Sequence, residues 1–262
     1  MPPKTREVKF GPHLFRIAET PGGFEGIVVG AGAARFAAPD EAALVRRLSA
    51  EAMRGERGFV GYDGARARFL RLFPRGFADP VLSKDELEYK REMAEWLARE
   101  APLERALRGE ADPRVILRGF QRTNLADTFT KAKLGTVLKG LRAADLVVIL
   151  ARFAADRDVA PACEALAREF AGEGVATWPV LTYPAFFWDP AKHCFLKPEF
   201  TKEYARRVGH RFAVDYETRP SAATYLQLLD MLGETRAAIA DLGPRDNIDL
   251  HSFMWAVCMY DD

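Results

Sequence analysis

Six basic side chains fall within residues 115–142, and only one acidic residue, Asp127, lies among them. Contacts to phosphates supply most of the sequence-independent affinity of proteins for nucleic acids. A helical face that carries several of these cations could therefore hold a nucleic-acid backbone. The alternative is a solvated face whose charge is balanced by acids elsewhere in the fold, since long basic side chains commonly cover apolar surface. The six residues are Arg118, Arg122, Lys131, Lys133, Lys139 and Arg142.

A second, weaker excess of basic residues lies within residues 191–215, where six cations accompany three acids. The aromatic residues at 186–188, together with Phe195, could stack bases while the cations follow the phosphates, as in proteins that bind single strands. Aromatic residues at this density more often belong to a hydrophobic core. From this region we predict Lys197 and Lys202 as contacts to nucleic acid.

The residues that could support catalysis are few. None of the four histidines belongs to an HExxH or HxE pattern, the three cysteines form no CxxC pair, and GxSxG and Walker sequences are missing, so we predict no metal site and no cofactor. The weak candidates for acid–base chemistry are His251, Asp249 and His193. Asp249 could orient His251 as a general base, although residues two apart on a helix point in different directions. Helix capping by Asp246 or Asn247 accounts for the same polar cluster.

The overall charge excludes a general attraction to polyanions. The 262 residues include 38 Lys and Arg against 37 Asp and Glu, so binding to nucleic acid or to an anionic membrane must depend on a local patch. The longest apolar run, at residues 146–151, is far too short to span a bilayer, and the N-terminus lacks a secretory signal. With an odd number of widely spaced cysteines, these features predict a cytoplasmic protein that has no membrane segment. They do not determine its oligomeric state.

The hydrophobic pattern predicts an α+β protein in which a small N-terminal antiparallel β-meander packs on a mainly α-helical body. Residues 8–38 contain β-branched and aromatic residues interrupted by turn sequences, which is typical of short strands. Periodicity and capping residues, among them Asp40 and Ser221, then predict a succession of helices. The three prolines of residues 178–194 argue against one continuous helix there, although Pro184 could begin a helical turn at its first position. We predict a β-rich unit at 1–39 and a helical body at 40–262, with helices at 41–54, 65–73, 85–100, 102–107, 124–135, 136–155, 161–170, 199–208, 221–241 and 248–259.

Two segments resemble an uncharacterised family of bacterial proteins of similar length. Residues 195–202, FLKPEFTK, match the pattern FLKPxxTK, and residues 244–255, PRDNIDLHSFMW, match PRDxIDxxSFxW. The similarity extends over most of the chain, including FGPHLFRI at residues 10–17. The resemblance implies one natural bacterial domain, and it transfers no activity, cofactor or site residue.

Three functions remain open from the sequence. The first is a binding module for DNA, RNA or another polyanion that uses the local basic surfaces. The second is a hydrolase that acts on a phosphorylated or nucleobase substrate, with His251, Asp249 or His193 as acid or base. The third is a structural or regulatory subunit whose aromatic segment at residues 178–188 docks a protein partner.

Overall fold

The computed structural model describes residues 5–10, 12–30, 34–54, 58–123 and 125–261. Asn124, at which one helix is predicted to begin, lies outside the described residues. The chain divides into two compact units, and each is built from segments that are distant in sequence. The first unit comprises Met1–Pro74, Glu199–Tyr216 and Met254–Asp262, and the second comprises Arg75–Pro198 and Glu217–Phe253.

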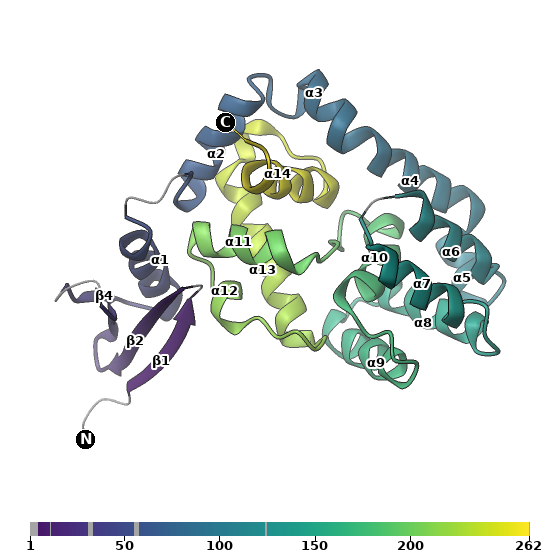
Figure 1. Ribbon diagram of the computed structural model, residues 1–262, viewed down its shortest axis with the longest axis horizontal. Coiled ribbons are helices and arrows are strands. Elements are labelled where there is room, and N and C mark those ends of the chain that lie inside the picture. Colours follow the sequence, from purple (N-terminus) through teal and green to yellow (C-terminus); the bar gives the residue numbers. More distant parts are fainter. Residues whose placement is uncertain (1–4, 11, 31–33, 55–57, 124, 262) are drawn as a thin grey trace. The chain divides into compact units, whose positions relative to one another are not determined.

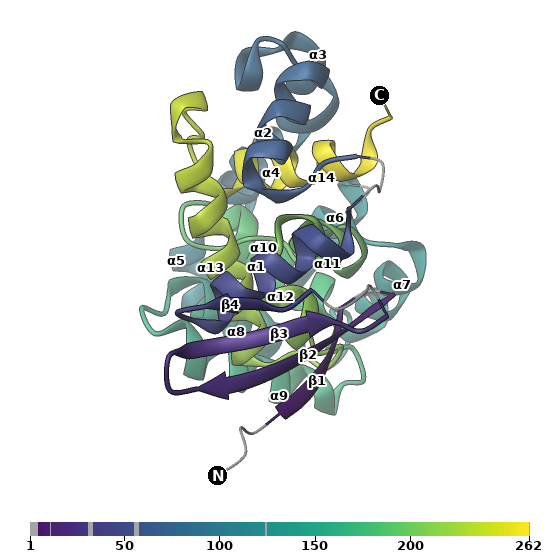
Figure 2. The ribbon, with the colours of Figure 1, turned by 90° about the vertical axis from the view of Figure 1, so that its left-hand side faces the viewer.

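The first unit contains a four-stranded antiparallel sheet in the order β1-β2-β3-β4, which Figure 2 shows face-on. Its strands alternate between buried and exposed residues, so one face collects the apolar side chains. This face packs against the buried leucines and valine of α1 (Glu41–Ala52). Asp40 caps that helix by accepting a hydrogen bond from Ala43 N at 2.7 Å. The strands are β1 (Thr5–Phe10), β2 (His13–Thr20), β3 (Gly23–Val28) and β4 (Phe36–Ala38).

The turn between β2 and β3 requires glycine at position 23. Gly23 has a φ of 125°, and a Cβ atom there would lie 2.4 Å from the carbonyl oxygen of Ala38. Any larger residue would therefore push β4 away from β3. The sequence Pro21-Gly22-Gly23 is one of the turn sequences that interrupt residues 8–38, and its last glycine also fixes how closely the third and fourth strands approach.

Three helices and the last turns of a fourth complete the first unit. Arg68 of α2 (Gly61–Leu72) donates hydrogen bonds to the carbonyl oxygens of Val257 at 3.0 Å and Tyr260 at 2.6 Å. Because a buried arginine needs such acceptors, these bonds hold the C-terminal segment against α2. The remaining elements are α11 (Pro198–Val208), α12 (Phe212–Asp215) and, from Met254 onward, α14 (Asn247–Met259).

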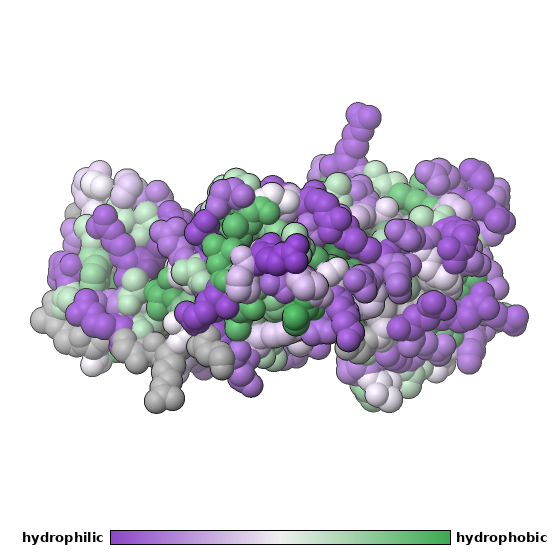
Figure 3. All heavy atoms as spheres, turned by 90° about the horizontal axis from the view of Figure 1, so that it is seen from above, coloured by the Kyte–Doolittle hydropathy of each residue, from purple (hydrophilic) through white to green (hydrophobic). Residues whose placement is uncertain are grey.

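The second unit consists of helices, several of which pack around α8 (Figure 1). Here α8 contacts α5, α6, α9 and α10, while α10 also packs on α4 and α13 packs on α9. Figure 3 shows hydrophilic residues over much of the face drawn, with smaller hydrophobic areas between them. The helices are α3 (Pro80–Leu82), α4 (Glu88–Glu100), α5 (Leu103–Leu107), α6 (Pro113–Arg122), α7 (Thr128–Val137), α8 (Ala143–Ala155), α9 (Val159–Gly172), α10 (Trp178–Trp188), α13 (Ala222–Ala238) and the first turns of α14, with a π-helical segment at Ser83–Leu87 and 3-10 turns at Gly76–Ala78 and Ala240–Leu242.

The predicted fold class is confirmed, because an N-terminal antiparallel sheet precedes a mainly helical remainder. Among the helices of the described ranges, none is both long enough and apolar enough to cross a bilayer. The prediction that residues 178–194 do not form one continuous helix is confirmed, because α10 ends at Trp188, before Pro190. Pro184, however, lies in the interior of α10 and does not begin a helical turn. Pro179 lies in the first turn, where its missing N–H has no helical acceptor in any case. Since nine of the 11 residues of α10 are buried, packing offsets the hydrogen bond that Pro184 cannot donate.

Candidate nucleic-acid interface

The first basic region covers α6, α7 and the turn that follows α7, and the two helices pack side by side. Asp112 caps α6 through Arg114 N at 2.9 Å, and the apolar residues of α6 are buried, so Arg118 and Arg122 lie one turn apart on the exposed side. Asp127 caps α7 by accepting hydrogen bonds from Thr130 N at 2.9 Å and Thr130 Oγ1 at 2.6 Å. These bonds hold the pKa of Asp127 below its usual value. The one acid of the region is therefore committed to a helix cap.

The cations of this region differ in what they contact. Lys131 Nζ donates to the carbonyl oxygen of Thr123 at 2.6 Å, and Lys133 Nζ donates to that of Gly174 at 3.4 Å. Both contacts orient the ammonium group without neutralising it. Arg118 and Lys139 are exposed, and within the described part of the chain neither has an ion-pair partner. Arg122 lies over the ring of Trp96, 5.0 Å from its centroid.

Arg142 is the exception among the six. Its guanidinium contacts Glu169 at 2.9 Å and Glu173 at 3.1 Å, both on or next to the last turn of α9. These acids raise the pKa of Arg142 and offset its charge. For this residue the structure matches the alternative of a face balanced by acids from elsewhere in the fold. Five cations therefore remain as candidates for phosphate contacts.

An exposed aromatic ring among these cations was missed in the sequence. Phe129 is 70% exposed, and Lys133 Nζ lies 4.8 Å from the centroid of its ring. Leu141, in the turn after α7, is fully exposed. Thr130 and Leu134 are the buried positions of α7, and Phe129 lies outside their four-residue spacing. In the sequence, only this four-residue spacing of the inward-facing positions could have indicated that the Phe129 side chain faces solvent.

The second basic region does not form one surface within either unit. Lys197 belongs to the second unit and is half-buried, whereas Lys202 is exposed on α11 of the first unit. Phe186, Phe187 and Phe195 are each at most 2% exposed. These rings belong to the core of the second unit and present no face to bases. The burial of α10 likewise leaves little of it available to the protein partner predicted as a third possibility.

The candidates for acid–base chemistry have separate buried surroundings. His193 is fully buried, with Nδ1 3.1 Å from the Tyr225 hydroxyl and Nε2 3.1 Å from the carbonyl oxygen of Ala154. Burial, and to a smaller extent the charge of Lys192, lowers the pKa of His193 to about 4. The surroundings therefore keep this imidazole neutral and shielded from solvent.

His251 lies between rings, with centroid distances of 5.4 Å to Phe186 and 5.8 Å to Phe195. Burial, together with the charges of Lys90 and Lys197, holds the pKa of His251 well below its usual value. Asp249 makes no acid–base pair with it and instead accepts a hydrogen bond from Arg91 Nη2 at 2.5 Å.

Asp249 also accepts from the backbone of Arg245 at 2.8 Å and from its Nε at 3.2 Å. Like the two histidines, it is no more than 1% exposed. A substrate could not reach any of the three without local unfolding, so this arrangement does not support their predicted catalytic role.

A buried ionic cluster, which no sequence pattern had indicated, joins α14 to the start of α4. Lys90 Nζ is fully buried and donates to Glu86 Oε2 and to Ser252 Oγ, each at 2.8 Å. Burial lowers the pKa of Lys90, and the Glu86 carboxylate acts in the opposite direction. These contacts have the character of a structural network.

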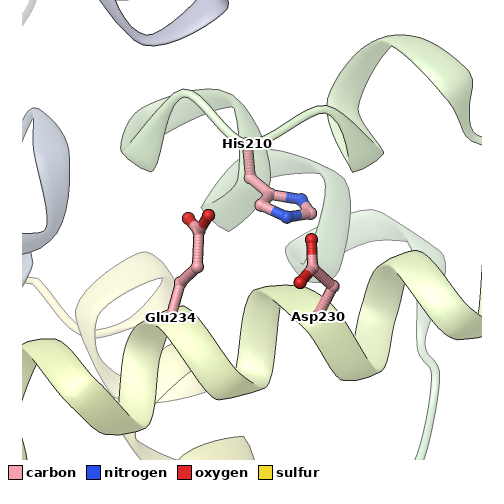
Figure 4. Close-up of side chains that lie close together, drawn as sticks. All are labelled: His210, Asp230 and Glu234. Carbon is pink, nitrogen blue, oxygen red and sulfur yellow. The ribbon is translucent and has the colours of Figure 1, made fainter. Parts of the chain in front are cut away.

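Two carboxylates of α13 form a smaller acidic pair. Asp230 and Glu234 lie one turn apart and project from the same side of the helix (Figure 4). His210, drawn in the same figure, belongs to the first unit, where its Nδ1 accepts a hydrogen bond from Phe212 N at 3.1 Å. Carboxylates spaced by one turn are common on exposed helix faces, so this pair does not identify a metal site in the second unit.

The comparisons with known proteins add no relative from which a role could be transferred. No family model matches the chain, and neither the curated proteins nor the solved structures gave a match. The resemblance to a bacterial family in residues 195–202 and 244–255 therefore stays a prediction.

Proposed function

We propose that the protein binds single-stranded nucleic acid through an exposed surface on its second unit. We call this surface the α6–α7 surface, and it consists of Phe129 and five cations. The observation that carries the proposal is the exposed ring of Phe129 beside the ammonium of Lys133. An aromatic ring in this position can stack on a base while neighbouring cations contact the phosphates. The cations are Arg118, Arg122, Lys131, Lys133 and Lys139.

A single strand suits this surface better than a duplex. In a duplex the base faces are stacked on one another, and a protein ring reaches them only by unstacking a step, which costs a few kcal/mol. A single strand offers its base faces at little cost. The cations of the α6–α7 surface would give affinity without reading sequence, because phosphates carry no sequence information.

Loss of the exposed ring tests the proposal directly. Phe129→Ala should weaken binding of an oligothymidylate by about tenfold, since stacking contributes about 1–3 kcal/mol per base. Fluorescence anisotropy of a labelled oligonucleotide measures the affinity. Leu226→Ala is the matched control, because Leu226 is another exposed apolar side chain, 44% exposed, on α13. This control should bind like the wild type.

Charge reversal provides the second arm of this test. In the double variant Arg118→Glu/Lys139→Glu, the logarithm of the association constant should fall less steeply with the logarithm of the salt concentration. The slope should be smaller in magnitude by about 1.4, the value for two lost phosphate contacts to a single strand. The double variant Lys84→Glu/Arg157→Glu changes the net charge equally at exposed positions outside the surface. An equal loss in both double variants, or binding to anionic vesicles but not to oligonucleotides, would contradict the proposal.

A further inference from the structure

A groove in the first unit plays no part in the binding proposed for α6 and α7. Its volume is about 700 Å³, and its walls are the end of β1, the following turn, α11, α12 and Tyr216. This volume is in the range of pockets that hold small molecules. The side chains that give the groove its chemistry are Lys9, Lys202, Arg206, Tyr216, Glu199 and Glu203.

Two ammonium groups make the groove attractive to an anion. Lys9 on β1 and Lys202 on α11 are both exposed, and neither forms an ion pair with another described residue. Lys202 and Arg206 are one helical turn apart, so α11 directs both toward the groove. These cations approach the groove from two different elements of the fold.

Of the two acids that line the groove, Glu203 is already ion-paired with arginines. Glu203 accepts hydrogen bonds from Arg206 Nε at 2.9 Å and Nη2 at 3.0 Å, and from Arg207 Nε at 2.6 Å. Burial opposes its ionisation, but the hydrogen bond and charge of Arg206 and the charge of Arg207 hold the pKa of Glu203 below its usual value. Glu199, in the first turn of α11, forms no ion pair with another described residue, so its carboxylate oxygens can accept hydrogen bonds from a ligand.

An aromatic ring completes the groove. Lys202 Nζ lies 5.1 Å from the centroid of the Tyr216 ring, and this cation–π contact is of the weak kind that exposed side chains make. Phe212, which is buried, packs against the same ring at 5.5 Å and supports it. The base of a ligand could replace the ammonium over this ring, which frees Lys202 to contact a phosphate.

We propose that this groove binds a nucleoside phosphate. The phosphates lie between Lys9 and Lys202, the base stacks on Tyr216, and a sugar hydroxyl donates to Glu199. A free phosphate would use only the cations and an uncharged nucleoside only the ring and the carboxylate, so a nucleotide fits the full set of side chains better than either. The site lies wholly in the first unit and does not depend on the α6–α7 surface.

Calorimetric titration of the full chain with ADP, adenosine and inorganic phosphate tests this assignment. ADP should bind, and adenosine and phosphate should each bind more weakly. Lys202→Gln should weaken ADP by about tenfold, the effect expected for one charge-assisted hydrogen bond, and should leave adenosine unchanged. Tyr216→Leu should weaken ADP and adenosine alike.

Two further variants distinguish base stacking from misfolding and the groove from the α6–α7 surface. Tyr216→Phe keeps the ring and should bind ADP like the wild type, so a loss in Tyr216→Leu alone reports the missing ring. Phe129→Ala should not change ADP binding, because Phe129 lies in the second unit. No ADP binding, equal binding of phosphate and ADP, or a loss caused by Phe129→Ala instead of Lys202→Gln would overturn the assignment. Each of these outcomes is independent of whether the oligonucleotide experiment succeeds.

Discussion

Replacing Lys90 by methionine should lower the free energy of unfolding by about 3–5 kcal/mol, the usual cost of removing one member of a buried ion pair. Lys90 is fully buried, and its ammonium lies 2.8 Å from both Glu86 Oε2 and Ser252 Oγ. Methionine keeps most of the volume of the side chain and removes the charge. The variant then retains the Glu86 carboxylate in a buried position without the ammonium of Lys90.

Urea unfolding followed by circular dichroism measures this loss. Lys84→Met is the matched control, because Lys84 is exposed in the same π-helical segment as Glu86 and its replacement should change stability by less than about 0.5 kcal/mol. The double variant Lys90→Met/Glu86→Leu should be more stable than Lys90→Met alone, since exchanging a whole buried pair for apolar side chains is often neutral. A loss below about 1 kcal/mol in Lys90→Met would show that the pair contributes little.

The cluster around Lys90 also shows why part of the structure could not be predicted from the sequence. Lys90 and Ser252 are 162 residues apart, and Arg91 and Asp249 are 158 residues apart. Local patterns identify Asp249 only as one member of a polar helix start, which is compatible with both capping and catalysis. Only the structure, in which α4 packs near α14, shows that the Asp249 carboxylate accepts hydrogen bonds from Arg91 and Arg245.

Features set by neighbouring residues were predictable. The strands of the N-terminal sheet follow from alternating apolar residues and the turn at residues 21–23, and several helix starts follow from capping residues such as Asp40 and Ser221. The helix at residues 178–188 ends before Pro190, as the prolines predicted, but the same propensity rule did not predict that the buried helix α10 continues through Pro184. The local preference of a segment determines its secondary structure only where packing does not compete with that preference.

The candidate interface was predictable to a similar extent. Counting charges located the cations of α6 and α7, but the acids that compensate Arg142 lie 27 and 31 residues further along the chain. The exposure of Phe129 depends on which side of α7 packs inward, and that side is set by contacts with other helices. Residue types indicated the kind of surface, and packing decided which of its members face solvent.

The protein should lose stability as the pH falls below about 6.5, because two histidines are held neutral in the folded state. The pKa of His193 is lowered to about 4 and that of His251 is also lowered, each from an ordinary value of 6.5. Below pH 6.5 the unfolded chain binds protons at these positions and the folded chain does not, so protonation favours unfolding. The full stability is present above pH 6.5, and the part due to His193 is lost progressively down to about pH 4.

For His193 alone, this linkage amounts to about 2 kcal/mol between pH 7.5 and pH 5, and His251 acts in the same direction. Urea unfolding at the two pH values measures the difference, in a range where few carboxylates titrate. His251→Leu should show a smaller difference than the wild type, because it removes one of the two proton-linked groups. Phe195→Leu disturbs the packing beside His251 but keeps the imidazole, so it should lower stability at both pH values and leave the difference unchanged. If His251→Leu kept the full pH dependence, burial would not lower the pKa of His251 in the folded protein. The acid sensitivity would then come from other groups.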